Sequence, residues 1–170
     1  MEIGFYCVRI DNNLRILQTS DVKNSPFVCS DATSIPFADK SFDCVVAFDL
    51  LEHTDDMAVL KEVARVTRRR AIFAVPFEKD ALWYKAGFVF NHYIDVTHHR
   101  YYTLEGFRGI LTSSGLKIIG LYPYLWIEPR RVIRALLKPG WLFLAPLLQL
   151  LSSGFVRRVP TACIAVAEVP

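Results

Sequence analysis

The sequence predicts an α/β fold in which a mostly parallel sheet carries helices on both faces. Short β-branched or aromatic runs alternate with amphipathic segments along the 170 residues, a pattern typical of strands joined by right-handed crossovers. One run, 42–48, is apolar apart from Asp43, as expected for a strand covered on both sides. The hydrophobic content of 52% is sufficient for one core, so we expect a single domain, 1–170.

The first part of the chain predicts three strands, each followed by a polar residue. The expected strands are 5–10, 27–29 and 42–48. Asp11 begins a turn-forming cluster after the first, Asp31 follows the second, and Asp49 follows the third. A short helix is expected around Leu14–Leu17. Ligands bind parallel sheets beyond the carboxyl ends of their strands, so these polar residues are the first candidates for a site.

The clearest helix is expected after residue 53. Thr54 is the predicted cap, Asp55 and Asp56 suit the positive end of the helix dipole, and Arg65 and Arg68 suit its negative end. The predicted buried stripe consists of Met57, Leu60, Val63 and Ala64.

The second half of the chain contains two longer segments between its expected elements. The expected elements are strands at 71–75, 116–121 and 161–167, a helix at 103–111, and a helical, apolar insertion at 126–158 before the last strand. Residues 77–102 form an aromatic, irregular connection, and connections of this length are often functional. Their aromatic side chains indicate an apolar pocket wall, with core packing as the alternative.

Composition narrows the possible partners. The net charge of +3 is too small to predict a nucleic-acid partner. Four cysteines lie far apart in apolar runs without C-x-x-C spacing, which predicts reduced core thiols, a cytoplasmic protein and no metal site. The apolar run 141–151 is about half the length of a membrane-spanning helix.

The most specific pattern extends from Asp31 to His53. It consists of Asp31-Ala-Thr-Ser-Ile-Pro-Phe-Ala-Asp-Lys-Ser-Phe-Asp43 and Val45-Val-Ala-Phe-Asp-Leu-Leu-Glu-His53. This pattern resembles the central signature of class I S-adenosylmethionine-dependent methyltransferases, in particular the small, ubiquinone-biosynthesis-like group. The resemblance implies a Rossmann-like sheet, S-adenosylmethionine as cofactor, and methyl transfer to a small-molecule acceptor.

The same resemblance implies roles for residues at the strand ends. Asp11 would accept hydrogen bonds from the ribose hydroxyls, and Asp31 from the adenine amino group. The backbone of Ala32 would meet an adenine ring nitrogen, and Phe48 would lie beside the cofactor. In the alternative interpretation, Asp11 and Asp31 are ordinary turn residues. Their spacing, together with the signature after Asp31, favours cofactor binding.

Residues 95–103 resemble the loop that borders the acceptor pocket in this family. The resemblance implies that Asp95, Arg100 and Tyr101 contact the acceptor. His98 and His99 are candidate general bases, because histidine titrates near pH 6.5, at about working pH. In the alternative, His98 or Arg100 only stabilises the loop. His53, which follows Glu52 at the entry to a helix, is interpreted as structural.

The sequence departs from the family at its N-terminal end. The family's first strand and its Gly-x-Gly-x-Gly loop should precede Asp11, and only ten residues do so here. Gly4 is followed by no second glycine in this region. We therefore expect a sheet that is incomplete at the N-terminus and weak binding of S-adenosylmethionine, as in a shortened or inactive form. The alternative function is a non-catalytic interaction or membrane-surface module.

The insertion combines basic and apolar residues. Arg130, Arg131 and Arg134 precede the apolar run that begins at Trp141. This pairing suits peripheral contact with anionic lipid, or with a lipid-linked substrate, through 130–151. The alternative is an ordinary helix packed across the sheet. A nicotinamide-dependent oxidoreductase is disfavoured, because no G-x-G-x-x-G precedes Asp11 and no Tyr-x-x-x-Lys pair occurs.

Overall fold

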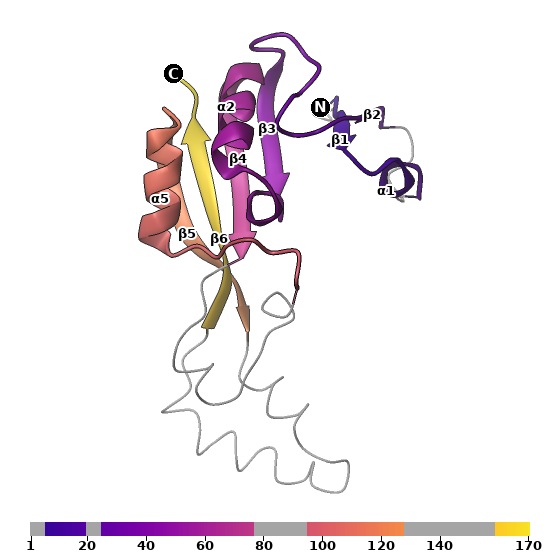
Figure 1. The fold of residues 1–170 in the computed structure, drawn as a ribbon. Coiled ribbons are helices and arrows are strands. Elements are labelled where there is room, and N and C mark those ends of the chain that lie inside the picture. The colour runs from indigo at the N-terminus through magenta and orange to yellow at the C-terminus, as the bar shows by residue number, and fades with distance from the viewer. Residues whose placement is uncertain (1–5, 20–24, 77–94, 128–158) are drawn as a thin grey trace, which may run out of the picture.

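The computed structural model describes residues 6–19, 25–76, 95–127 and 159–170 (Figure 1). The strands are β1 (Arg9–Asp11), β2 (Phe27–Cys29), β3 (Phe42–Phe48), β4 (Thr67–Pro76), β5 (Lys117–Ile127) and β6 (Val159–Glu168). The helices are α1 (Leu14–Thr19), the 3-10 helix η1 (Leu51–His53), α2 (Asp56–Val66) and α5 (Leu104–Ser113).

The strands form two sheets. β1 and β2 are parallel partners, with Asp11 opposite Cys29. The larger sheet has the order β3-β4-β6-β5, in which β3 and β4 are parallel and β6 is antiparallel to both of its neighbours. The expected α/β fold with a mostly parallel sheet is confirmed, since β3, β4 and β5 all run in one direction and only β6 runs against them.

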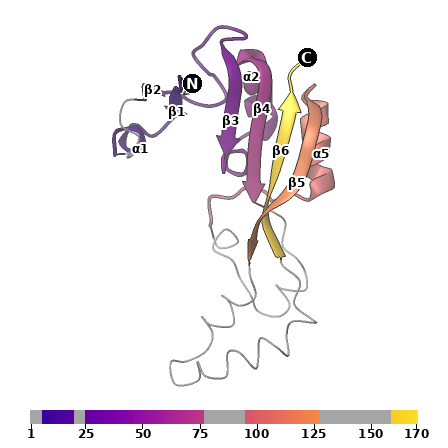
Figure 2. The same ribbon diagram turned by 180° about the vertical axis from the view of Figure 1, so that it is seen from behind.

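The two sheets are separated between β1 and β3. Within the described ranges, β1 pairs only with β2 and β3 pairs only with β4. The separate β1–β2 unit stands beside the β3 edge of the larger sheet in both views (Figures 1 and 2). Each of these two strands therefore has one edge at which the described residues supply no partner strand.

Both helices that pack on the larger sheet lie on one of its faces (Figures 1 and 2). The core beneath them comes from alternate strand positions and the apolar faces of α2 and α5. Its fully buried members include Leu51, Val59, Leu60, Ala71, Phe73, Val75, Phe107, Leu111, Cys163 and Ala165. α1 packs instead against β1 and β2. The sequence predicts helices on both faces of the sheet. The described residues include helices on one face of the larger sheet.

Three expected element boundaries are wrong. The first strand begins at Arg9, and residues 6–8 are irregular. Helix α2 is capped by Asp55, whose side chain accepts a hydrogen bond from the backbone N–H of Ala58. The hydroxyl of Thr54 instead donates to the carbonyl of Leu50. β4 begins at Thr67, so Arg68 belongs to a strand, where it pairs with Asp43.

Two expected segments lie largely outside the described residues. The connection 77–102 is described from 95 onward, and the insertion 126–158 falls in 128–158 except for its first two residues, which continue β5. Residues 130–151 are among those not described. No helix in the described part of the chain has the length and apolarity needed to cross a membrane.

The four cysteines differ in burial, contrary to the expectation of four core thiols. Cys7, Cys29 and Cys44 are exposed. Cys29 and Cys44 lie on β2 and β3, and Cys7 lies in the irregular segment before β1. Cys163 is 0% exposed, and burial raises the pKa of its thiol to about 12.

Thiol titration of the folded chain should therefore count three reactive cysteines at neutral pH. Only the thiolate is nucleophilic, and Cys163 is protonated as well as covered. We expect a fourth equivalent only after unfolding in denaturant, and the Cys163→Ala variant should lose that equivalent alone. Fast reaction of all four thiols with the native chain would contradict this assignment.

Candidate functional site

Two carboxylates lie at the ends of neighbouring strands. Asp11 is the last residue of β1, and Asp31 follows β2 by two residues. The backbone N–H of Ser30 donates to the carbonyl of Asp11 across 3.1 Å, which extends the pairing to the strand ends. Asp11 and Asp31 are therefore brought to the same edge of the β1–β2 unit, as the sequence predicts.

Each carboxylate uses one oxygen in a local turn. Oδ1 of Asp11 accepts from the backbone N–H of Asn13 at 2.7 Å. Oδ1 of Asp31 accepts from the backbone N–H and the hydroxyl of Thr33 at 2.8 and 2.7 Å, and these bonds lower the pKa of Asp31. The turn-forming interpretation is thus correct for Oδ1. Among the described residues, Oδ2 of each has no hydrogen-bond partner, so each carboxylate retains an acceptor for a ligand.

The loop after Asp31 is held against α2 by one arginine and one glutamate. Arg65 donates to the carbonyls of Ile35 and Phe37 at 2.9 and 2.8 Å, and to the carboxylate of Asp39 at 2.8 Å. Glu62 accepts from Arg65 at 2.8 Å and from the backbone N–H of Ile35 at 2.9 Å. These bonds fix the path from the β1–β2 unit to the larger sheet.

Phe48 and Ala32 take different positions at the carboxyl ends of the strands. Phe48 is the last residue of β3, and 52% of its surface is exposed. Ala32 is half-buried and packs against the main core. The next residue after β3, Asp49, has a φ of 49°, a left-handed conformation that turns the chain sharply into η1.

A loop from residue 95 crosses over η1 and is fixed to it by hydrogen bonds. The backbone N–H of His99 donates to the carbonyl of Glu52 at 2.8 Å. Nδ1 of His53 lies 3.2 Å from the carbonyl oxygen of Thr97 and 3.0 Å from its hydroxyl. The Thr97 hydroxyl in turn donates to Asp95 at 2.6 Å. Residues far apart in the sequence thus meet at one end of the sheet.

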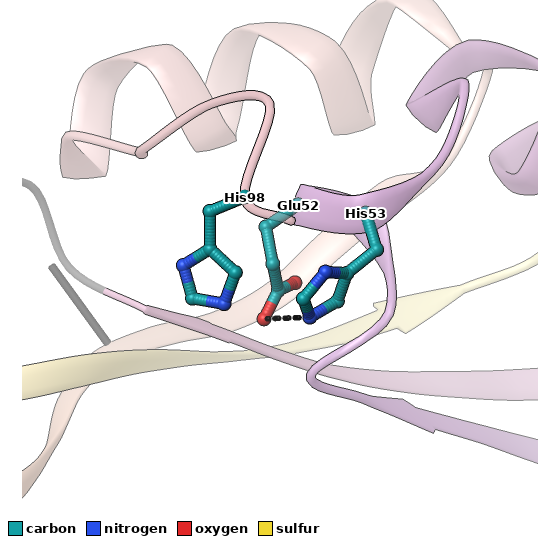
Figure 3. A group of neighbouring side chains, drawn as sticks. All are labelled: Glu52, His53 and His98. Atoms are coloured by element: carbon teal, nitrogen blue, oxygen red, sulfur yellow. Dashed lines mark ion pairs between the residues drawn. The ribbon is translucent and has the colours of Figure 1, made fainter. Parts of the chain in front are cut away.

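Glu52 lies beneath this loop, between two imidazoles (Figure 3). Its side chain is 1% exposed, and neither carboxylate oxygen has a hydrogen-bond partner among the described residues. Oε1 lies 4.0 Å from Nε2 of His53, which is too long for a hydrogen bond. Burial is the main cause that raises the pKa of Glu52 to about 7. The rings of His53 and His98 lie 4.5 Å apart in edge contact.

A second buried carboxylate, Asp56, fixes the far end of the loop. Nη1 of Arg100 lies 2.6 Å from Oδ2 of Asp56, and the hydroxyl of Tyr102 donates to the same oxygen at 3.2 Å. Asp56 is the first residue of α2 and is buried. Tyr102 packs against Phe107 of α5. Arg100 therefore joins the loop to α2, which favours the loop-stabilising interpretation over a free side chain, and its contact with the acceptor stays a prediction.

The other sequence-predicted site residues lie along the same loop. The side chain of His98 is 6% exposed and its ring is in contact with Tyr101, whereas His99 is exposed. Asp95 is exposed, and hydrogen bonds from Thr97 lower its pKa. The structure thus separates the two candidate bases: His98 faces the buried Glu52, and His99 contributes mainly its backbone N–H.

Comparisons by sequence and by structure both match this chain to methyltransferases. Residues 2–75 match the family model described as a methyltransferase domain. The demethylmenaquinone methyltransferase of Corynebacterium urealyticum is 40% identical over 68 residues, which are 39% of this chain and 30% of that protein. The enzyme of the same name from Mycobacterium sp. (strain KMS) is 44% identical over 66 residues, 38% of this chain and 29% of that protein. The matched segment therefore spans less than a third of these relatives.

Solved structures extend the likeness to nearly the whole chain. A SAM-dependent methyltransferase from Archaeoglobus fulgidus has a TM-score of 0.65 at 18% identity, and covers 95% of this chain and 75% of that one. A possible histamine N-methyltransferase from Thermotoga maritima has a TM-score of 0.66 at 13% identity, with coverage of 96% and 72%. The resemblance to the class I methyltransferases is confirmed. At these identities, the structures establish the methyltransferase fold alone.

The methyltransferase resemblance also accounts for the separation of the two sheets. In that family the strand before the glycine-rich loop lies in mid-sheet. In the described residues, the sheet is interrupted at the position of that strand, between β1 and β3. Asp11 and Asp31 lie on one side of this separation and Phe48 lies on the other.

The buried cluster of Glu52, His53 and His98 was not predicted from the sequence. Glu52 was considered only as the neighbour of His53, and His53 was interpreted as structural. The available signal was a glutamate four residues after the apolar strand 42–48, directly after two leucines. His98 lies 45 positions after His53, so only the fold brings it to the pair.

Proposed function

We propose that the chain contributes the adenosine-binding edge and the acceptor-facing loop of an S-adenosylmethionine-dependent methyltransferase. One observation carries the proposal: Asp11 and Asp31 end paired strands, and each keeps one carboxylate oxygen without a partner among the described residues. These acceptors suit the hydroxyl and amino donors of an adenosine. The methyltransferase family match over residues 2–75 includes both carboxylates.

Each proposed contact follows from the chemistry of the side chain. Asp11 accepts from the vicinal ribose hydroxyls, for which a carboxylate is a suitable acceptor. Asp31 accepts from the adenine amino group, and its lowered pKa keeps it in the accepting, ionised form. The backbone N–H of Ala32 donates to an adenine ring nitrogen, and the exposed ring of Phe48 lies beside the cofactor. These residues fit the adenosine half of the cofactor.

The chemical step requires mainly positioning. The cofactor supplies a methyl group already activated as a sulfonium. The protein must hold the acceptor in line with it and exclude water, which contributes several kcal/mol to lowering the barrier. For a hydroxyl acceptor, His98 or His99 would remove the proton. Asp95, Arg100 and Tyr101, on the same loop, would border the acceptor.

The acceptor we propose is an apolar or lipid-linked small molecule. Two relatives that match 66–68 residues of this chain are named demethylmenaquinone methyltransferases, which supports an acceptor of this class. The basic and apolar segment 130–151 suits peripheral membrane contact, and it lies outside the described residues. Flotation with anionic liposomes, compared with neutral ones, would test this contact.

Ligand-observed NMR tests the cofactor site directly. Residues 1–170 place only the adenosine-facing carboxylates at the proposed site, so S-adenosylmethionine added to them should receive saturation mainly at its adenine and ribose protons. Asp31→Ala should abolish the adenine signal, and Asp11→Ala the ribose signal.

The matched control is Asp43→Ala, since Asp43 is an exposed carboxylate near the start of β3, at the opposite end from Phe48. It should leave the signals unchanged. Saturation that survives in both site variants would remove the adenosine assignment, as would a signal confined to the methionine protons.

A further inference from the structure

The buried carboxylate of Glu52 has an environment that none of the proposed cofactor contacts explains. A buried, unpaired carboxylate is unfavourable unless it is protonated or meets a cation. The ionisable side chains around Glu52 include Asp49, His53, Asp95 and His98, and no lysine or arginine contacts Glu52 within the described ranges. The two imidazoles can each offer one N–H, but neither oxygen of Glu52 has a hydrogen-bond partner in these ranges.

The hydrogen bonds of His53 determine which of its nitrogens faces Glu52 with a lone pair. The carbonyl of Thr97 can only accept, and the Thr97 hydroxyl already donates to Asp95. Nδ1 of His53 must therefore carry the hydrogen. In the neutral ring, Nε2 then directs its lone pair toward the cluster, 4.0 Å from Oε1 of Glu52. A backbone carbonyl that fixes the tautomer in this way is a common partner of metal-binding histidines.

His98 completes the set from the other side of Glu52 (Figure 3). Its Nδ1 is buried without a hydrogen-bond partner, and its Nε2 is 3.7 Å from the carboxylate of Asp95. One donor atom from each of Glu52, His53 and His98 lies within 4.8 Å of the other two. Two donors bound to one ion at about 2.1 Å are about 3 to 4 Å apart, so the side chains would need to close by only about 1 Å.

We propose that Glu52, His53 and His98 form a binding site for a single divalent transition-metal ion of the Zn²⁺ or Co²⁺ type. Two imidazoles and one carboxylate are a donor set that such ions accept, whereas Mg²⁺ and Ca²⁺ favour oxygen ligands alone. The site lies where η1 follows β3, at the same end of the sheet as Phe48. This inference goes beyond the proposed methyl transfer and does not depend on it, and His98 bound to a metal would leave His99 as the candidate base.

Cobalt titration tests the site, because Co²⁺ reports its ligands by visible absorption. The chain should bind one equivalent and show d–d bands without a thiolate charge-transfer band, since no cysteine belongs to the site. Zn²⁺ should remove the bands, and either ion should raise the thermal unfolding midpoint. His53→Ala and His98→Ala should each weaken binding by more than about 10-fold.

The neighbouring histidine supplies a matched control. His99→Ala removes an exposed imidazole outside the cluster and should leave cobalt affinity unchanged. His53 is partly exposed, so its alanine variant should fold. Its cobalt affinity therefore tests the proposed site even if His98→Ala fails to fold. Absence of d–d bands in the wild-type chain would overturn the proposal, as would thiolate ligation or affinity that His53→Ala leaves intact. Cofactor binding does not enter this test, so its failure leaves the adenosine assignment untouched.

Discussion

Replacing Arg65 with alanine is expected to lower the free energy of unfolding by about 3 kcal/mol. The guanidinium makes hydrogen bonds to two carbonyls of the 35–37 loop, to Asp39 and to Glu62. Its loss leaves these partly buried carbonyls and the Glu62 carboxylate without their donor. Chemical denaturation followed by circular dichroism measures the change.

Arg68 provides the control for this experiment. It pairs with Asp43 at 2.9 Å, but both side chains are more than half exposed. Arg68→Ala should therefore cost less than about 1 kcal/mol. Arg65→Lys should fall between the two, since one ammonium cannot reach all four partners. Equal losses for Arg65→Ala and Arg68→Ala would contradict the role of Arg65 in holding the loop.

Elements with one dominant local signal could be predicted from the sequence. β2 and β3 begin and end where their apolar runs do, and α5 begins at its Thr103 cap, which accepts from Gly106 at 2.9 Å. The start of β4 was predicted four residues too late, because Arg68, Arg69 and Arg70 do not fit an apolar pattern. They are in a strand because of pairing with β3 and β6, which local sequence cannot reveal.

The candidate site was also only partly predictable from the sequence. Asp11 and Asp31 were predictable because each lies at or just after the end of a strand, and parallel strands end at a common edge. The buried cluster was not, because it depends on contacts between η1 and a loop some 45 residues later. The hydrogen bond from His99 to Glu52 and the orientation of the His53 ring are properties of the assembled fold.

Replacing Arg100 with alanine is expected to destabilise the chain by about 2 to 3 kcal/mol. Asp56 is buried, and it would keep only the hydroxyl of Tyr102 as a partner. Loss of one member of a fully buried pair costs about 3 to 5 kcal/mol, and the 39% exposure of Arg100 reduces this value. The loop that carries His98 would also lose its attachment to α2, so amide hydrogen exchange should rise in residues 95–103.

A double-mutant cycle separates the loss of the ion pair from the loss of arginine packing. Asp56→Asn removes the charge that needs Arg100 while leaving an amide oxygen for Tyr102. In this background, Arg100→Ala should cost at least 1 kcal/mol less than in the wild-type chain, because no carboxylate is left buried alone. If Arg100→Ala costs the same in both backgrounds, Asp56 is not the group that Arg100 stabilises. Arg100 would then be available for the acceptor contact implied by the family resemblance.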